Sequence, residues 1–104
     1  MGVSRKQIAD VFREAKTKLA QNYEDWMSGS SSKKYICGAI EDTCLPLHVQ
    51  EYAKRIIQYR LDGFSTVGAY LEVKMGIKRS DRTFDNVQAY RHAWLDSLIA
   101  EYSK

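Results

Sequence analysis

Near the start of the chain, apolar residues recur at helical spacing: Ile8, Val11, Phe12, Ala15 and Leu19. Residues three and four apart lie on the same side of a helix, so this spacing predicts an amphipathic helix of about four turns. Ser4 precedes the run, and Gln7 stands three residues after Ser4. This is the arrangement of a capping box at a helix N-terminus. We expect the apolar side of this helix to be buried.

The helical pattern stops over residues 22–32. A Ser-Gly-Ser-Ser-Ser run predicts a flexible loop near residues 28–32. The same segment holds Tyr23, Trp26 and Met27, which are too apolar for a plain linker. We expect these three side chains to pack against the core.

Two further helices are predicted on either side of Pro46. The first begins near Ser32 and must end before Pro46, because a residue that precedes proline is driven out of the helical conformation. The second runs from Leu47 to about Leu61, and Gly63 is placed to end it. The residues predicted to face inward from this second helix are Val49, Tyr52, Ala53, Ile56 and Ile57.

The last two predicted helices are unequal in length. Thr66 caps a short one that continues to Lys74 and ends at Gly76, and the other begins near Thr83 and continues for about five turns. The inward residues of the long helix are Val87, Tyr90, Arg91, Trp94, Leu95, Leu98, Ile99 and Tyr102, with Arg91 at the edge. Over the whole chain, the core is expected to include Phe12, Ile36, Ile40, Ile56, Leu71, Trp94 and Leu98.

The composition agrees with one folded domain. The 104 residues are 44% hydrophobic and 28% charged, which is close to the average of globular domains, and no internal repeat or run of alternating strand pattern interrupts them. We therefore predict an all-α fold, a single compact domain of about five helices over residues 1–104. The net charge of +3 permits anionic partners but is modest for a dedicated nucleic-acid-binding protein.

Two features bear on the compartment. The N-terminal residues lack the apolar region of a signal peptide, and no run approaches the roughly 18 apolar residues of a membrane span. Cys37 and Cys44, if both lie on one helix, are separated by roughly 10.5 Å of helical rise, which exceeds the Cα separation of about 7 Å that a disulfide tolerates. We expect reduced, buried thiols in a cytoplasmic protein that has no contact with the membrane.

Enzyme chemistry has little support in the sequence. The chain lacks a glycine-rich phosphate loop, a His-Glu-x-x-His pair, a nucleophile elbow and a Cys-x-x-Cys motif. His48 and His92 stand alone, without the spacing of metal ligands, and Cys37 lies among apolar residues rather than in the electropositive setting of a reactive thiol. We predict a protein without catalytic residues, metal or cofactor.

One candidate binding site lies at the predicted start of the second helix. Lys33 and Lys34 open that helix directly after a serine-rich loop that ends in Ser32. Free backbone N–H groups, a partial positive charge and two ammonium groups could together hold a phosphate or another anion, with Arg91 as a helper if the last helix passes nearby. Two solvated lysines beside a loop are the simpler interpretation, and the sequence alone favours it.

A second candidate is a protein interface. Aromatic residues and arginine are enriched where protein partners bind tightly, and Tyr23 and Trp26 with the basic pair Lys54 and Arg55 are the interface candidates. A helix-turn-helix over residues 66–91 is less favoured, because Gly76 to Thr83 separates the two helices by about twice the usual three or four residues.

Several segments together resemble a known group of proteins. These are Ile-Cys-Gly-Ala-Ile-Glu at 36–41, Ala-Lys-Arg-Ile-Ile at 53–57, Arg-Leu-Asp-Gly at 60–63, Tyr-Leu at 70–71 and Gln-Ala-Tyr-Arg-His-Ala-Trp-Leu-Asp-Ser-Leu-Ile at 88–99. Over about residues 35–102, the chain resembles small, uncharacterised accessory proteins of tailed bacteriophages. The resemblance implies a role in the bacterial host cytoplasm, where such proteins often bind and inhibit host machinery, including antiviral defence. It supplies no catalytic or ligand-binding residues.

These observations lead to a prediction of function. We expect a non-enzymatic phage accessory protein that binds and inhibits or sequesters a host component during host takeover. The component would be a host protein, such as an antiviral-defence protein, or a small phosphate-bearing signal molecule. The alternative is a nucleic-acid-binding regulator. A homo-oligomer is compatible with either function.

Overall fold

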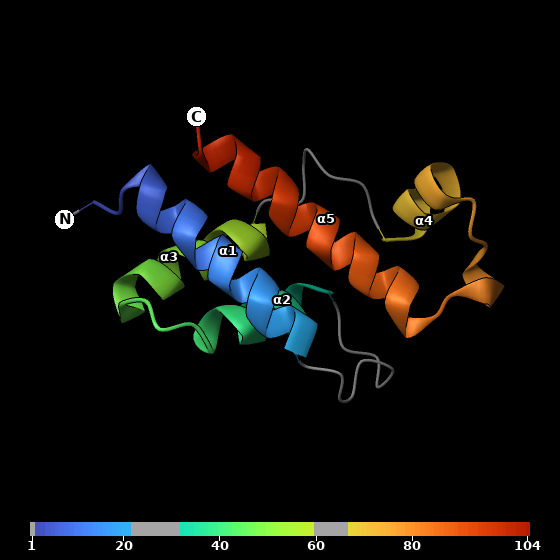
Figure 1. The fold of residues 1–104 in the computed structure, drawn as a ribbon, viewed down its shortest axis with the longest axis horizontal. Coiled ribbons are helices and arrows are strands. Elements are labelled where there is room, and N and C mark those ends of the chain that lie inside the picture. Colours follow the sequence, from blue (N-terminus) through green and yellow to red (C-terminus); the bar gives the residue numbers. More distant parts are fainter. Residues whose placement is uncertain (1, 22–31, 60–66) are drawn as a thin grey trace.

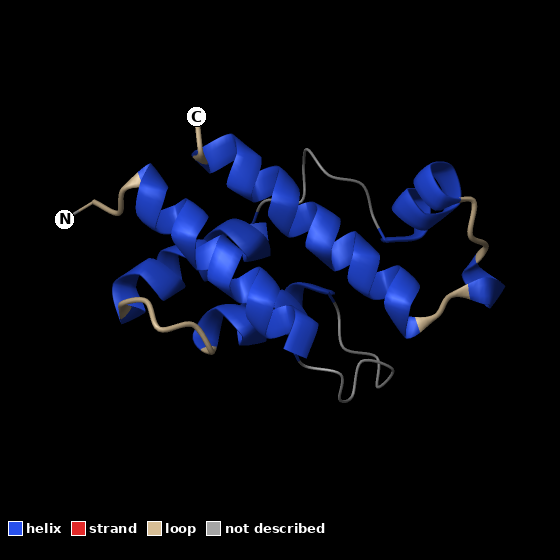
Figure 2. Ribbon diagram, in the orientation of Figure 1, coloured by secondary structure: helices blue, strands red, loops and turns tan. Residues whose placement is uncertain are grey.

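The computed structural model describes residues 2–21, 32–59 and 67–104, and the statements below concern those residues. They form five α-helices and one short 3₁₀ turn, without a strand (Figures 1 and 2). The helices are α1 (Arg5–Gln21), α2 (Ser32–Glu41), α3 (Leu47–Tyr59), α4 (Val67–Met75) and α5 (Phe84–Tyr102), and the 3₁₀ turn spans Arg79–Asp81. The prediction of a compact all-α fold with five helices is confirmed.

Helix α1 lies at the centre and packs against α2, α3 and α5. Its predicted apolar side is at most 2% exposed throughout, from Ile8 to Leu19. The capping box is also formed: the Ser4 N–H donates to Gln7 Oε1 at 2.9 Å, and the Gln7 N–H donates to Ser4 Oγ at 3.1 Å. These two bonds satisfy backbone donors that a helix start otherwise leaves without partners.

Helices α1 and α5 lie side by side and run in opposite directions (Figure 1). Three contacts record this arrangement, because later residues of α1 meet earlier residues of α5. Arg5 Nη2 donates to the Glu101 carbonyl at 2.6 Å, Lys16 Nζ lies 2.7 Å from Asp96 Oδ1, and Gln88 Nε2 donates to the Leu19 carbonyl at 2.7 Å. Both ends of the chain therefore lie at the same end of the molecule.

A buried amide closes the turn between α2 and α3. Gln50 is 9% exposed, and its Nε2 donates to the carbonyls of Thr43 at 2.9 Å and Leu45 at 3.1 Å. The Thr43 hydroxyl donates to the Ile40 carbonyl at 2.7 Å. Helix α2 thus ends at Glu41, before Pro46 as predicted, and the chain reverses into α3.

The buried side of α3 differs from the predicted one. Val49, Ala53 and Ile57 are fully buried, and Ile56 packs against the core but is only partly buried; Tyr52 is 44% exposed, so its prediction is wrong. Gln50 occupies the edge of the buried side, which turns the helix so that Tyr52 faces solvent. The predicted ends of this region, Gly63 and Thr66, lie outside the described residues.

The prediction for the two cysteines also needs a correction. Neither forms a disulfide, as expected, but Cys37 is only half-buried and Cys44 is exposed. Cys44 lies beyond the end of α2, in the connection to α3, where its backbone N–H donates to Glu14 Oε1 at 2.7 Å. The prediction of two buried thiols assumed a helix that continued to Cys44.

Helix α4 packs against the first half of α5 and extends away from the other helices (Figure 1). Leu71 is buried there, and the Tyr70 and Tyr90 rings meet edge to face with centroids 5.6 Å apart. Gly76 ends α4 as predicted, with φ of +67°, and the Ile77 N–H donates to the Leu71 carbonyl at 2.8 Å. The molecule is elongated, with extents of 46 × 28 × 20 Å.

Helix α5 begins where the sequence predicted. The Thr83 side chain accepts a hydrogen bond from the Asn86 N–H at 3.2 Å and so caps the helix. Trp94, Leu95 and Leu98 are buried against the other helices, as expected. None of the described helices combines the length and the apolar character that a membrane span requires.

Candidate functional site

The outer side of α3 exposes large apolar and aromatic side chains. Leu47 is 68% exposed, Tyr52 is 44% exposed and Tyr59 is 84% exposed. Because exposed apolar surface is unfavourable in water, apolar residues that gather around one hollow, as Leu47 and Tyr52 do, indicate a surface that another molecule covers. Helix α3 presents this side because Val49, Ala53 and Ile57 anchor its opposite side in the core.

Part of this surface is hollowed into a groove of about 640 Å³, which we call the α3 groove. The volume lies within the range of about 300–1,000 Å³ that is usual for binding pockets. The groove lies between α3 and the segment that precedes α1. Its lining consists of Val3, Leu47, His48, Glu51, Tyr52 and Arg55.

The lining combines apolar area with the hydrogen-bond donor Arg55 and with one carboxylate, Glu51. Val3, Leu47 and Tyr52 offer apolar and aromatic surface, and the exposed Arg55 guanidinium can bind a carboxylate with two parallel hydrogen bonds. Tyrosine and arginine contribute strongly to protein–protein binding. The arrangement suits a partner segment that inserts an apolar side chain and presents a carboxylate beside it.

The structure describes two of the four predicted interface residues, Lys54 and Arg55, and gives them different surroundings. Arg55 lines the α3 groove, whereas Lys54 pairs with Glu41 of α2, its Nζ 3.0 Å from Glu41 Oε2. This hydrogen bond raises the pKa of Lys54. Tyr23 and Trp26 lie outside the described residues.

Sequence reasoning missed the apolar part of the groove. The sequence predicts Tyr52 in the core and assigns no binding role to Leu47 or Val3. Leu47 is the residue that could have indicated the groove from the sequence. It is apolar and directly follows Pro46 at the helix start, but it does not share the buried side formed by Val49, Ala53 and Ile57.

The predicted anion site at the start of α2 is only partly described. The side chains of Ser32 and Lys33 lie outside the described part, and Lys34 is exposed. Arg91 does lie near this end of α2, because its Cζ stands 4.2 Å from the centroid of the Tyr35 ring. However, Arg91 is only 2% exposed, its Nη1 also donates to Gln88 Oε1 at 3.4 Å, and burial lowers its pKa. The contacts of Arg91 are those of a core residue, and the site stays a prediction.

His92 and the connection between α4 and α5 also bear on the functions weighed from the sequence. Burial lowers the pKa of His92, an effect that nearby Lys16 reinforces and Asp96 opposes. In the described part of the chain, no group of three or more His, Cys, Asp or Glu side chains is arranged to hold a metal ion. Helices α4 and α5 are separated by residues 76–83, which include the 3₁₀ turn, so this pair of helices lacks the tight turn of a helix-turn-helix.

Comparison of the chain with protein-family models, with curated proteins and with solved structures finds no match.

Proposed function

We propose that the chain is a non-enzymatic phage accessory protein that binds a bacterial host protein through the α3 groove and inhibits or sequesters it. The observation that carries the proposal is the exposure of Leu47 and Tyr52 around a groove with Arg55 at its side. The resemblance to accessory proteins of tailed bacteriophages supplies the context, and an antiviral-defence protein is the kind of target that such proteins inhibit.

The occupant of the groove is a host-protein segment that carries an apolar side chain next to a carboxylate. The apolar side chain matches Val3, Leu47 and Tyr52, and the carboxylate matches Arg55. The net charge of +3 on the chain also favours encounter with an acidic partner surface.

The test begins with the identification of the partner. The wild-type chain and a Leu47→Ala/Tyr52→Ala double variant are immobilised and exposed to host lysate. The proteins that each one binds are then compared by mass spectrometry. A host protein that the wild type captures and the double variant loses is then purified, and its Kd is measured by calorimetry. Its activity is assayed with and without the chain.

We expect Tyr52→Ala to weaken binding by about thirtyfold or more, because central aromatic anchors contribute about 2 kcal/mol or more. Tyr59→Ala is the matched control, since Tyr59 is an exposed tyrosine of the same helix that does not line the groove. The control should change the Kd by less than about threefold. Equal Kd values for wild type and Tyr52→Ala would refute the role of the groove, and an unaffected target activity would refute inhibition.

A further inference from the structure

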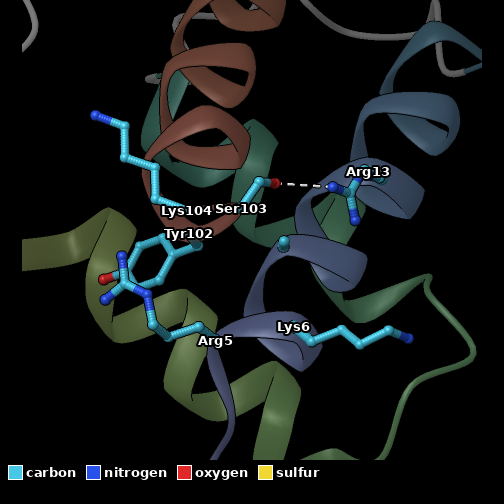
Figure 3. A pocket seen from close by; sticks show the side chains of 7 residues that line it. Arg5, Lys6, Arg13, Tyr102, Ser103 and Lys104 are labelled. Atoms are coloured by element: carbon cyan, nitrogen blue, oxygen red, sulfur yellow. Dashed lines mark hydrogen bonds between the residues drawn. The ribbon is translucent and has the colours of Figure 1, made fainter.

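A second hollow, which we call the cationic pocket, lies where the start of α1 meets the end of α5 (Figure 3). Its volume is about 290 Å³. Four of its seven lining residues carry a positive charge and none is acidic. The lining consists of Arg5, Lys6, Ala9, Arg13, Tyr102, Ser103 and Lys104.

The helix geometry of α1 creates the hollow. Arg5, Ala9 and Arg13 are four residues apart, so they lie on one side of the helix. Ala9 is 1% exposed and its short side chain leaves space between the two arginines. The end of α5 closes the pocket with the Tyr102 ring and the Ser103 hydroxyl.

Both guanidinium groups are held in place. Arg5 Nη2 donates to the Glu101 carbonyl at 2.6 Å, and its Cζ lies 4.9 Å from the centroid of the Tyr102 ring. Arg13 donates from Nη1 to Asp10 Oδ1 at 2.9 Å and from Nη2 to Ser103 Oγ at 2.8 Å (Figure 3). These contacts use part of the five N–H donors that each guanidinium carries. A positioned donor loses less entropy when a ligand binds.

The charge around the pocket is unbalanced. Asp10 accepts from Arg13 and also lies 3.4 Å from Lys6, so one carboxylate serves two of the four cations. Lys6 and Lys104 extend outward on opposite sides of the pocket (Figure 3). Arg5 and Lys6 moreover occupy the first turn of α1, where the helix dipole favours anions. An anion in the pocket would neutralise part of the excess positive charge and would also interact favourably with the dipole of α1.

We propose that the cationic pocket binds the phosphate group of a small phosphomonoester, in addition to the protein partner of the α3 groove. A terminal phosphate carries about −1.5 to −2 charges and three acceptor oxygens, which matches two arginines and a serine hydroxyl. Ser103 Oγ accepts from Arg13, and a hydroxyl that accepts can also donate its own proton to a ligand.

The size and shape of the pocket favour a small ligand over nucleic acid. A volume of 290 Å³ is at the lower end of the range of about 300–1,000 Å³ for ligand pockets, so it accommodates a phosphate and the atoms next to it. Nucleic-acid surfaces spread their cations along a face or stripe that follows successive phosphates. Here Arg5 and Arg13 line one hollow, and Lys6 and Lys104 extend outward from it, so the cations do not follow a stripe.

The test uses inorganic phosphate and adenosine 5′-monophosphate as probes, followed by NMR of backbone amides in the full chain. We expect saturable shifts at Arg5, Arg13 and Ser103, with affinity that falls as salt rises. Arg13→Gln should weaken binding of the monophosphate about tenfold, because it removes charge-assisted hydrogen bonds. Lys74→Gln is the control, since it removes the same charge from an exposed position of α4, which lines neither the cationic pocket nor the α3 groove, and should leave the affinity within about twofold.

A second variant distinguishes a loss of phosphate binding from a loss of folding. Lys6→Gln/Lys104→Gln changes exposed side chains, so its melting temperature should match the wild type while phosphate binding weakens at least threefold. Shifts that do not saturate, or equal losses in Arg13→Gln and Lys74→Gln, would overturn the proposal. So would an oligothymidylate that binds more tightly per phosphate than the monophosphate. None of these results affects the α3 groove, whose test measures a protein partner.

Discussion

Helices α1 and α4 show two different ways of fixing a helix in one small protein. Helix α1 packs against three other helices, and its apolar residues from Ile8 to Leu19 are at most 2% exposed. Helix α4 packs against α5, and Leu71 is its one fully buried residue among the side chains described. Val73 of the same helix is 79% exposed. We call α1, α2, α3 and α5 the bundle, and α4 with residues 76–83 the arm.

The difference follows from the order of residues rather than from their overall hydrophobicity. The apolar residues of α1 gather on one side, which gives that helix a large contiguous surface to bury. In α4, apolar residues are distributed around the helix, so contact with α5 leaves others exposed. Stability therefore should be high in the bundle and lower in the arm, with local opening of α4 expected before global unfolding.

The largest expected effect comes from Phe12→Ala in the bundle. Phe12 is fully buried, and its truncation should lower the free energy of unfolding by about 3–5 kcal/mol, which is much of the total for a domain of this size. Urea unfolding followed by circular dichroism measures the change. The counterpart is Leu71→Ala in the arm, at an equally buried position.

For Leu71→Ala we expect hydrogen exchange to accelerate in α4 while the urea midpoint of the bundle moves less than in Phe12→Ala. The reason is that the contacts of Leu71 belong to a helix that can open without the bundle. Equal midpoint shifts in both variants would show that the arm and the bundle unfold as one unit, and the comparison would then fail.

A smaller effect is expected from glycine substitutions, with opposite signs in the two regions. Gly76→Ala in the arm should destabilise α4 by about 1 kcal/mol, because φ of +67° is strained for alanine although a Cβ would meet no neighbouring atom. Gly38→Ala in the bundle is the control. It lies within α2 in open space and should stabilise the protein by about 0.5–1 kcal/mol. Thermal melting and exchange of the α4 amides distinguish the two, and destabilisation by both substitutions would contradict the assignment.

The smallest effect concerns pH and falls on the bundle. The pKa of His92 is lowered in the folded protein below its ordinary value of 6.5, mainly by burial and further by Lys16, against the opposing charge of Asp96. The unfolded chain therefore takes up the proton first as pH falls, so stability is full above about pH 6.5 and declines below it. Urea unfolding at several pH values should show a shallower decline in His92→Gln than in wild type. Parallel profiles would exclude His92 as the source.

Local rules in the sequence predicted much of the bundle and the ends of the helices. Ser4 with Gln7, Thr83 and Gly76 each marked a helix boundary, because capping and left-handed turns depend on a few adjacent residues. The orientation of α3 was not predictable in this way. It depends on Gln50, whose partners in the turn before α3 make a polar residue part of the buried side.

The two candidate binding surfaces were mostly hidden in the sequence for a related reason. Arg55 could be named in advance, but Val3 and Leu47 meet around the α3 groove only after the chain has folded back. Arg5 and Arg13 looked like ordinary polar positions of an amphipathic helix. Their significance comes from Tyr102 and Ser103, which lie about ninety positions later in the sequence and reach them through the antiparallel packing of α1 and α5.

Neighbouring positions on α5 have consequences for how this sequence can change over evolution. The Tyr90 ring meets Tyr70 of α4, and the next residue, Arg91, lies against Tyr35 of α2. A substitution in this single turn therefore affects contacts with the arm and contacts within the bundle at the same time. Related chains should vary freely at Val73 yet replace Tyr90 and Arg91 only together with their separate partners, so the two regions are expected to diverge at different rates on either side of this turn.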